Sequence, residues 1–375
     1  MDGPPVEAVL KAASDALGTP LTAGADLGGS DRSTVLRCER RGGGTVVIKS
    51  YPAAAEGWRG FAAEAAGLAF AGPAGAGPRL LASDASVPLV VMSDLGAAPS
   101  LADLLLGESA EAAGAAAGAL LSWARACGQL AVRTAGRQRE LAALQAAYPA
   151  ASPAGARHWL HRRIESAPGL AALLGITPPP GLAGDLADVA SILAPGGYEV
   201  FSPGDICPDN NLMTASGIRF VDFENAEFHS VFLDAAYLRM PFSTCWCVSR
   251  LPAELAAAAE LAYRAEVSAV FGELADDAVW QAGVVRAMAA WTIHAMTYLL
   301  DRSVTADRPI NQFVPQAPSG RQLLRYRWQM LGRELQAAGA LPALAALMRS
   351  LLAATDHWDV PDLPVYPAFR PLRQN

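Results

Sequence analysis

The sequence predicts an α+β protein, with a small N-terminal lobe that contains an antiparallel sheet and one helix, followed by a large and mostly helical C-terminal lobe. Three observations indicate this fold. A β-branched run at residues 45–49 follows a glycine-rich turn, two short apolar runs form a hairpin within residues 202–224, and stretches with helical periodicity fill much of the remaining chain. Of the 375 residues, 52% are hydrophobic, which is enough for the cores of two lobes.

The N-terminal lobe is predicted to span residues 1–95. Arg41 and three glycines form a hairpin turn before the strand at 45–49, and residues 27–33 contain an earlier glycine turn. Residues 61–70 have helical spacing, with Phe61 and Leu68 on one side. An apolar strand at residues 87–92 leads into a segment at about 92–96, which resembles the hinge between the two lobes of a bilobal fold.

The C-terminal lobe is predicted to span residues 96–375. Helical periodicity recurs at 101–106, 111–137 and 140–148, and breaks at 149–154 and 177–181. In the last third of the chain, three long helices are expected at 253–271, 276–300 and 320–338, each ended by glycine or proline signals.

The most informative segment runs from Ser202 to Glu224. It contains Asp205, an asparagine five positions later at Asn210, and Asp222 twelve positions beyond that. Phosphoryl transfer to a hydroxyl needs a carboxylate that accepts the hydroxyl proton and oxygen ligands that hold Mg²⁺ against the phosphates. Asp205 suits the first role, and Asn210 and Asp222 suit the second. Turn formation is the alternative explanation for these residue types, but the two halves in this order favour a phosphoryl-transfer site, with a catalytic loop at 202–212 and a metal segment at 218–224.

At these residues the sequence resembles the aminoglycoside phosphotransferase and choline kinase-like family, which has a bilobal protein kinase-like fold. The family's catalytic loop reads His-Gly-Asp-x-x-x-x-Asn and its metal segment reads Ile-Asp-Trp/Phe-Glu. The resemblance implies that Asp205 is the catalytic aspartate and that Asn210 and Asp222 bind the metal. Pro203 replaces the family's histidine, and proline fixes φ and removes a backbone donor. Asp234 is similar to a family aspartate that braces the catalytic loop, although an N-cap for the next helix is an equal alternative.

The resemblance also implies a site for ATP, or GTP, in the N-terminal lobe, with Mg²⁺ as the second cofactor. Backbone amides of the first glycine turn, at Gly28, Gly29 and Ser30, would cover the phosphates. Lys49 would hold the α- and β-phosphates, and Glu64 on a helix would orient this lysine. The main chain of the hinge, at Ser93 and Leu95, would meet adenine.

Charge and hydropathy narrow the choice of partners. The net charge of −7 argues against nucleic acid, because binding to phosphate backbones requires a basic surface. The chain contains no apolar segment of bilayer length and does not begin with a secretory signal, so no membrane partner is expected and a cytoplasmic location is predicted. A small-molecule hydroxyl acceptor is expected, and the acidic chain is compatible with a cationic one. Monomer and homodimer both stay open.

Together, the residues and the resemblance predict an ATP-dependent small-molecule kinase that phosphorylates a hydroxyl of a small polar metabolite or antibiotic. A non-catalytic kinase-fold protein that binds nucleotide or a partner is the alternative, as are kinases of choline, homoserine, methylthioribose or macrolides. By the resemblance, helices within 253–350 would cover the acceptor. Trp291, His294, Tyr298 and Asp301 share one helix face and fit an ammonium or a sugar, or ordinary helix packing.

Overall fold

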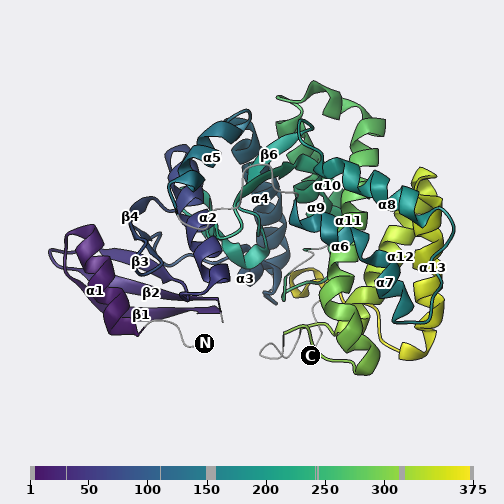
Figure 1. Cartoon of the computed structure of the whole chain (residues 1–375), viewed down its shortest axis with the longest axis horizontal. Helices are drawn as coiled ribbons and strands as arrows, with labels where there is room; N and C mark the ends of the chain where they lie inside the picture. The colour runs from purple at the N-terminus through teal and green to yellow at the C-terminus, as the bar shows by residue number, and fades with distance from the viewer. Residues whose placement is uncertain are drawn as a thin grey trace. The chain divides into compact units, whose positions relative to one another are not determined.

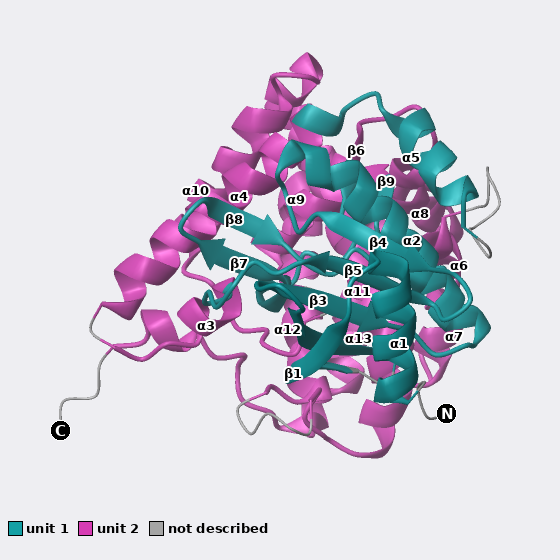
Figure 2. Ribbon diagram, turned by 90° about the vertical axis from the view of Figure 1, so that its left-hand side faces the viewer, with its two compact units in different colours: residues 1–100, 133–156, 201–228 teal, residues 101–132, 157–200, 229–375 magenta. Residues whose placement is uncertain are grey.

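The computed structural model describes residues 5–30, 32–109, 111–148, 158–240, 242, 245–311 and 317–371. Two compact units make up the chain (Figure 2): unit 1 comprises residues 1–100, 133–156 and 201–228, and unit 2 comprises residues 101–132, 157–200 and 229–375. The predicted α+β class is confirmed, because a five-stranded antiparallel sheet occupies the N-terminal part and most of the following chain is helical (Figure 1). Residues 133–156 and 201–228 group with the first hundred residues, and the predicted lobe boundary near residue 95 stays a prediction.

The sheet of unit 1 has the strand order β1-β2-β3-β5-β4. Thr45 to Lys49, the predicted β-branched strand, lies within β3, and Lys49 is paired with Val35 of β2 and Val90 of β5. The glycine turn at 41–44 connects β2 to β3 as expected. The strands are β1 (Leu21–Ser30), β2 (Ser33–Arg40), β3 (Thr45–Ser50), β4 (Leu80–Asp84) and β5 (Leu89–Ser93).

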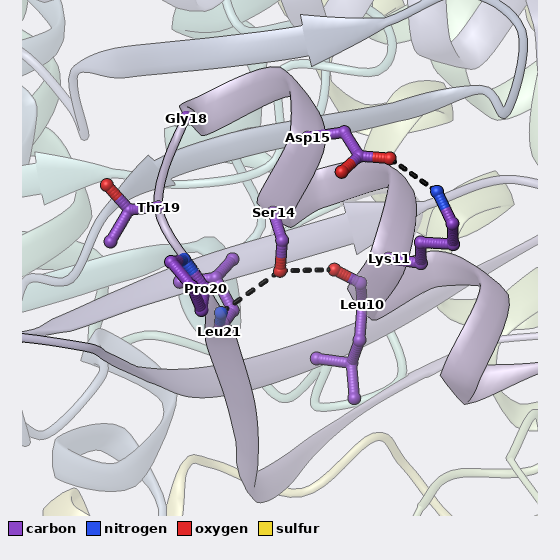
Figure 3. A pocket seen from close by; sticks show the side chains of 8 residues that line it. All are labelled: Leu10, Lys11, Ser14, Asp15, Gly18, Thr19, Pro20 and Leu21. Carbon is purple, nitrogen blue, oxygen red and sulfur yellow. Dashed lines mark hydrogen bonds and ion pairs between the residues drawn. The ribbon is translucent and has the colours of Figure 1, made fainter.

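Helix α1 (Val6–Leu17), which the sequence reasoning missed, packs on this sheet. Val9 and Ala13 join a buried cluster with Ile48 and other strand residues. At its C-terminal end, the Ser14 hydroxyl donates to the Leu10 carbonyl (2.7 Å) and accepts from the Leu21 amide (3.0 Å), so that α1 is tied to the start of β1 (Figure 3). The hollow beside this contact has a volume of about 510 Å³.

Helix α2 (Ala55–Ala71) carries the remaining segments of unit 1. Phe70 contacts Phe201 and Phe228, with ring centroids 4.8 and 5.8 Å apart. Gly67 allows close approach of the loop after β8, since a Cβ there would lie 2.9 Å from the Phe223 side chain. The other elements of this unit are the 3₁₀ helices η1 (Gly72–Ala74) and η3 (Pro208–Asn210), helix α5 (Gln138–Ala146), and the paired strands β7 (Asn211–Thr214) and β8 (Gly217–Phe220).

Unit 2 is built around α11 (Asp277–Thr305), in which most side chains are buried. The Asp276 side chain caps its N-terminus, as the predicted start at 276 requires. Helix α12 matches the predicted range 320–338, because Ser319 and Gln322 form a capping box and Gly339 ends the helix with φ 59°. Among the described residues, no helix is both long and apolar enough to cross a membrane.

The remaining helices of unit 2 differ in part from those expected. The sequence reasoning missed α6, α7, α8 and α13, and the predicted interruption at 149–154 lies outside the described residues. Two of the boundaries between the units fall inside strands, at β6 (Glu199–Ser202) and β9 (Glu227–Ser230). The helices are α3 (Leu101–Leu105), α4 (Ala112–Thr134), α6 (Trp159–Glu165), α7 (Ala167–Ala172), α8 (Leu182–Ala190), α9 (Val231–Arg239), α10 (Ala253–Val267), α12 (Gly320–Ala338) and α13 (Pro342–Ala354), with the 3₁₀ helices η2 (Ser191–Leu193), η4 (Gly272–Ala275), η5 (Asp356–Trp358) and η6 (Pro367–Phe369).

Candidate active site

Lys49 lies at the centre of a charged cluster in unit 1. Strand β3 delivers its side chain, which is 5% exposed, to three carboxylates. Its Nζ lies 3.0 Å from Glu64, 2.7 Å from Asp222 and 3.2 Å from Glu224. Burial alone would lower the pKa of Lys49, but the three carboxylates outweigh it and raise the pKa above its ordinary value. The lysine is therefore a permanent cation.

Glu64 reaches this lysine from α2 and is fully buried. Its Oε2 accepts hydrogen bonds from Lys49, from the Tyr51 hydroxyl (3.1 Å) and from the Phe223 amide (2.9 Å). Within the described parts of the chain, its Oε1 has no hydrogen-bond partner. Burial raises the pKa of Glu64, and the nearby Lys49 opposes this shift. The glutamate thus links α2, β3 and the loop after β8 through one oxygen atom.

Asp222 follows β8 and has a φ of 68°, in the left-handed region that residues other than glycine seldom adopt. Its Oδ1 accepts from Lys49 and, at 3.4 Å, from the Glu224 amide. The Phe223 amide is held by Glu64. These contacts on both sides of Asp222 hold its strained backbone conformation. Strained conformations of this kind cluster at functional sites.

The loop that carries Asp205 is held largely by hydrogen bonds between its own residues. The Asn210 side-chain amide donates to the Asp205 carbonyl (3.1 Å), and the Cys207 amide donates to the Asp205 carboxylate (3.3 Å). The Asn210 carbonyl accepts from the Val221 amide (2.9 Å), which brings Asn210 beside the segment that carries Asp222. The structure therefore gathers the three predicted chemical groups in one unit.

Burial, followed by the negative charges of Asp222 and Asp209, raises the pKa of Asp205 to about 7. The cluster holds five carboxylates against the two cations Lys49 and Arg32, and Arg32 pairs with Glu224 at 2.9 Å. This excess of negative charge and the hard oxygen donors fit a divalent cation such as Mg²⁺. The five carboxylates are those of Glu64, Asp205, Asp209, Asp222 and Glu224.

The predicted phosphate-covering turn lies at the end of β1. Gly28 has a φ of 92°, and its amide donates to the Asp26 carboxylate at 2.8 Å. Gly29 has a φ of 146°, and a Cβ there would lie 2.2 Å from the Ser33 carbonyl oxygen. Both glycines are thus required by the hairpin itself. The backbone of Ser30 belongs to β1, and its side chain lies outside the described residues.

The predicted hinge begins where β5 ends. The Ser93 amide donates to the Arg79 carbonyl (2.9 Å), so this donor is already used. Between Ser93 and Leu95, the Asp94 carboxylate binds the Arg37 guanidinium at 2.8 Å and accepts from the Gly96 amide at 2.9 Å. No hydrogen bond between described atoms joins Ser93 or Leu95 to the Lys49 cluster.

Several residues of the cluster were missed by sequence reasoning. Glu224 is one of them, and it pairs with both Lys49 and Arg32. Tyr51, whose hydroxyl donates to Glu64, lies directly after the end of β3 and two positions after Lys49, and continued alternation from the strand is a signal that could have identified it. Arg32 follows the glycine turn, but only the folded chain shows that it meets a carboxylate.

Asp234 and the aromatic band belong to unit 2. Asp234 lies inside α9 and contacts His229 Nε2 at 2.9 Å, so the N-cap alternative is wrong because the N-cap residue of α9 is Ser230. Trp291 is buried, and its indole N–H donates to the Leu233 carbonyl at 3.0 Å, as ordinary packing requires. Tyr298 is 39% exposed, and its ring centroid lies 5.2 Å from that of His294.

A sheet-borne lysine, paired with a helix glutamate and with an aspartate from a hairpin loop, is typical of enzymes that transfer phosphoryl groups from nucleotides. The chain belongs to the phosphotransferase enzyme family (APH), whose model matches residues 24–276, more than half of its length. It is therefore a phosphotransferase, and the family predicted from the sequence motifs is confirmed.

One solved structure supports the fold, and two others are similar to this chain over most of their length. A choline kinase from Cryptosporidium parvum Iowa II has a TM-score of 0.50 at 11% identity, over 88% of this chain and 93% of that chain. A choline/ethanolamine kinase family protein from Mesorhizobium loti has a TM-score of 0.48 at 17% identity, over 88% and 92% of the two chains. A macrolide 2'-phosphotransferase from Brachybacterium faecium has a TM-score of 0.48 at 16% identity, over 80% and 93%. No curated protein matches the sequence.

Proposed function

We propose that this phosphotransferase is a small-molecule kinase, which transfers the γ-phosphate of ATP to a hydroxyl of a small polar metabolite or antibiotic. One observation carries the proposal: Lys49 Nζ lies within hydrogen-bond distance of both Glu64 on α2 and Asp222 after β8. A purely structural ion pair needs one carboxylate, whereas a lysine shared by these two elements, beside Asp205 and Asn210, matches the needs of phosphoryl transfer.

In this proposal each residue has a separate role. Asp205 accepts the proton of the acceptor hydroxyl while the hydroxyl oxygen forms a bond to the γ-phosphorus and ADP departs. Lys49 binds the donor phosphates, and Glu64 keeps the lysine in place. Asn210 and Asp222 supply oxygen ligands for Mg²⁺, which would neutralise phosphate charge when bound. Since Asp222 now contacts Lys49 at 2.7 Å, a metal at Asp222 would free the lysine for the phosphates.

The nucleotide contacts at the glycine turn and hinge belong to the proposal as well. Gly28, Gly29 and Ser30 would approach the phosphates, which requires the Gly28 amide to leave the Asp26 carboxylate. The main chain at Ser93 and Leu95 would meet adenine through groups other than the Ser93 amide, since that amide binds Arg79. GTP is an alternative donor.

A non-catalytic nucleotide-binding protein is the second candidate. The occupied Gly28 amide and the proline at Pro203 favour it, because both depart from a turn and loop prepared for phosphate. A slow hydrolysis of ATP that depends on Mg²⁺ separates the candidates, since the kinase should show it and the non-catalytic protein should not.

A phosphorylation screen over hydroxyl-bearing amines, sugars and antibiotics tests the kinase and identifies its acceptor. Choline, homoserine, methylthioribose and macrolides are the first compounds to include. With an acceptor in hand, Asp205→Ala should cut turnover by at least about a hundredfold, as expected for loss of a general base, and should leave nucleotide binding largely intact. Asp15→Asn, which breaks an exposed ion pair with Lys11, is the control and should keep full turnover. Undiminished turnover in Asp205→Ala would remove this residue from the mechanism.

Binding of Mg²⁺ and nucleotide provides a second test that needs no acceptor. ATP with Mg²⁺ should raise the melting temperature of the wild type by mass action, and Asp222→Ala should lose the part of this rise that depends on Mg²⁺. An equal response in this variant would contradict the assignment of Asp222 to the metal.

A further inference from the structure

A second cavity lies entirely within unit 2. Its volume is about 780 Å³, and its lining residues come from α9, α10, α11, α12 and the chain near residues 250 and 362. This volume suits a small organic molecule. None of the residues proposed above for nucleotide, metal or catalysis lines it. The cavity therefore needs an explanation of its own.

The charged residues of the cavity differ in balance from those of the whole chain. Four arginines, two glutamates and one aspartate line it, so its formal charge is 4 − 3 = +1. The chain as a whole carries −7. A cationic cavity in an acidic protein favours an anionic ligand.

Two of the four arginines already have carboxylate partners. Arg239 Nε and Nη2 each lie 2.6 Å from an oxygen of Glu260, and Arg239 Nη1 lies 3.3 Å from Glu334. Arg264 binds Asp277 at 2.6 Å. These ion pairs join α9, α10, α11 and α12 on one side of the cavity. They leave no net positive charge on that side.

The other two arginines, Arg250 and Arg333, have no ion pair or side-chain hydrogen bond with any described residue. Arg250 Nε is buried and has no hydrogen-bond partner among the described residues. The backbone of Arg250 is held by the Pro364 carbonyl (2.7 Å) and the Tyr366 amide (3.0 Å), so the side chain starts from a fixed point. Because Nε is buried, a ligand oxygen would bind the outer nitrogens of this guanidinium, which have no partner among the described residues.

Tyr326 lines the same cavity as the two arginines. Burial raises the pKa of the Tyr326 hydroxyl, and the charges of Arg327, Arg250 and Arg333 oppose this shift. Tyr326 and Arg333 are seven positions apart on α12 and share one face. The tyrosine therefore stays neutral and keeps a hydroxyl proton that it can donate. Asp362, which is exposed, is the remaining charged residue of the lining.

The cavity also has an apolar wall. Leu261 on α10 is 64% exposed, the highest value among the exposed large apolar side chains of the described residues. Leu251 and Met330 line the same cavity. An exposed leucine is not informative by itself, but beside two unpaired arginines it indicates a ligand with an apolar body.

We infer that this cavity is a binding site for a small organic oxyanion, a carboxylate or phosphate group attached to an apolar body. Arg250 and Arg333 bind the anion with the Tyr326 hydroxyl as a third donor, and Leu261 covers the apolar part. The planar guanidinium suits both kinds of oxyanion, since it can donate two parallel hydrogen bonds. The inference does not depend on the kinase proposal, because no residue is shared between them.

Calorimetric titration of the full chain, without nucleotide, tests this site. Octanoate and octyl phosphate are the probes, and octylammonium is the matched cation. We expect one octanoate or octyl phosphate per chain and no binding of octylammonium. The stronger of the two anions distinguishes a carboxylate ligand from a phosphate ligand. Absence of binding by either anion at millimolar concentration, or equal binding of octylammonium, would overturn the inference.

Variants assign the binding to this cavity. Arg250→Gln and Arg333→Gln should each weaken octanoate binding by about tenfold or more, the loss expected for one charge-assisted hydrogen bond. Leu261→Ser should weaken octanoate but leave the weaker binding of inorganic phosphate unchanged. Arg349→Gln, an exposed arginine on α13 outside the cavity, is the control. Arg333 and Leu261 are exposed, so these variants keep the fold, and wild-type affinity in Arg333→Gln would place the anion elsewhere.

Discussion

At the scale of single residues, Lys49 shows how a buried charge is tolerated and used. Its ammonium is almost fully buried, yet it contacts Glu64, Asp222 and Glu224, which come from two segments far apart in sequence. Removing a buried partner costs more than the pair itself contributes, because the remaining charges stay desolvated.

Lys49→Met is therefore expected to destabilise the protein by about 3 kcal/mol, measured by urea unfolding without nucleotide. Lys11→Met is the matched control, because its ion pair with Asp15 is exposed and such pairs contribute less than about 1 kcal/mol. If both lysine variants unfold at the same urea concentration, Lys49 is not needed to compensate the buried charges of the three carboxylates.

The burial of His294 on α11 predicts how the stability of the protein depends on pH. Burial, assisted by the charges of Arg163 and Arg327, lowers its pKa from 6.5 to about 4. The folded protein therefore favours neutral histidine, while the unfolded chain binds a proton below pH 6.5. This contribution to stability is complete at neutral pH and is lost as the pH falls through the window between the two values.

His294→Gln should consequently lose less stability than the wild type on acidification from about pH 7 to about pH 4. Urea unfolding at both pH values gives the two differences. Since one pKa unit corresponds to about 1.4 kcal/mol, the variants should differ by roughly 2–3 kcal/mol. Parallel losses in both proteins would mean that the histidine is protonated in the folded state.

At the scale of elements, the loop that carries Asp205 depends on a close backbone approach at Gly204. This glycine has a φ of 86°, and a Cβ there would lie 2.0 Å from the Asn225 carbonyl oxygen. Gly204→Ala should therefore shift the loop, with a loss of stability of about 2 kcal/mol or more and a large loss of turnover. Gly184→Ala is the control in α8, where the new Cβ meets no atom within 4 Å and alanine favours the helix. Wild-type stability in Gly204→Ala would show that the loop accommodates a side chain there.

The same elements show what the sequence could predict. Helix α12 was predicted with its correct bounds because its caps are local signals, Ser319 and Gln322 at one end and Gly339 at the other. Helix α1 was missed because its N-cap, Pro5, makes no side-chain cap, and the prolines near the start of the chain indicate a coil. Among the site residues, Asp205, Asn210 and Asp222 could be selected by order and spacing, and Lys49 and Glu64 were selected through the family resemblance.

Contacts between distant segments could not be predicted from local signals or from spacing. Arg32 meets Glu224, and Arg37 meets Asp94, through pairings that depend on how β2 and the loops are placed. The occupied amide of Gly28 depends on the local path of β1, which a glycine pair leaves open. Periodicity and spacing describe one element at a time, whereas these contacts arise only after the elements pack.

At the scale of the whole molecule, unit 1 is discontinuous in sequence. Its three segments are residues 1–100, 133–156 and 201–228, so the sheet and α2 are made early in the chain, while the segment that contacts α2 comes later. Phe201 and Phe228 contact Phe70, and Phe223 binds Glu64 through its amide. The core of unit 1 is therefore incomplete until residue 228 has been made.

A fragment of residues 1–148 tests this dependence. It contains the complete five-stranded sheet, α1, α2 and α5, but it lacks the aromatic side chains that cover Phe70 and the amide that satisfies Glu64. Burying a large aromatic ring typically contributes about 1.5–3 kcal/mol, and a domain has only 5–15 kcal/mol in total. Loss of several such contacts should leave the fragment without a cooperative thermal transition by circular dichroism, whereas the full chain should show one. A sharp transition in the fragment at the temperature of the full chain would show that the sheet and α2 form a self-sufficient core, and that residues 201–228 join it only after it has folded.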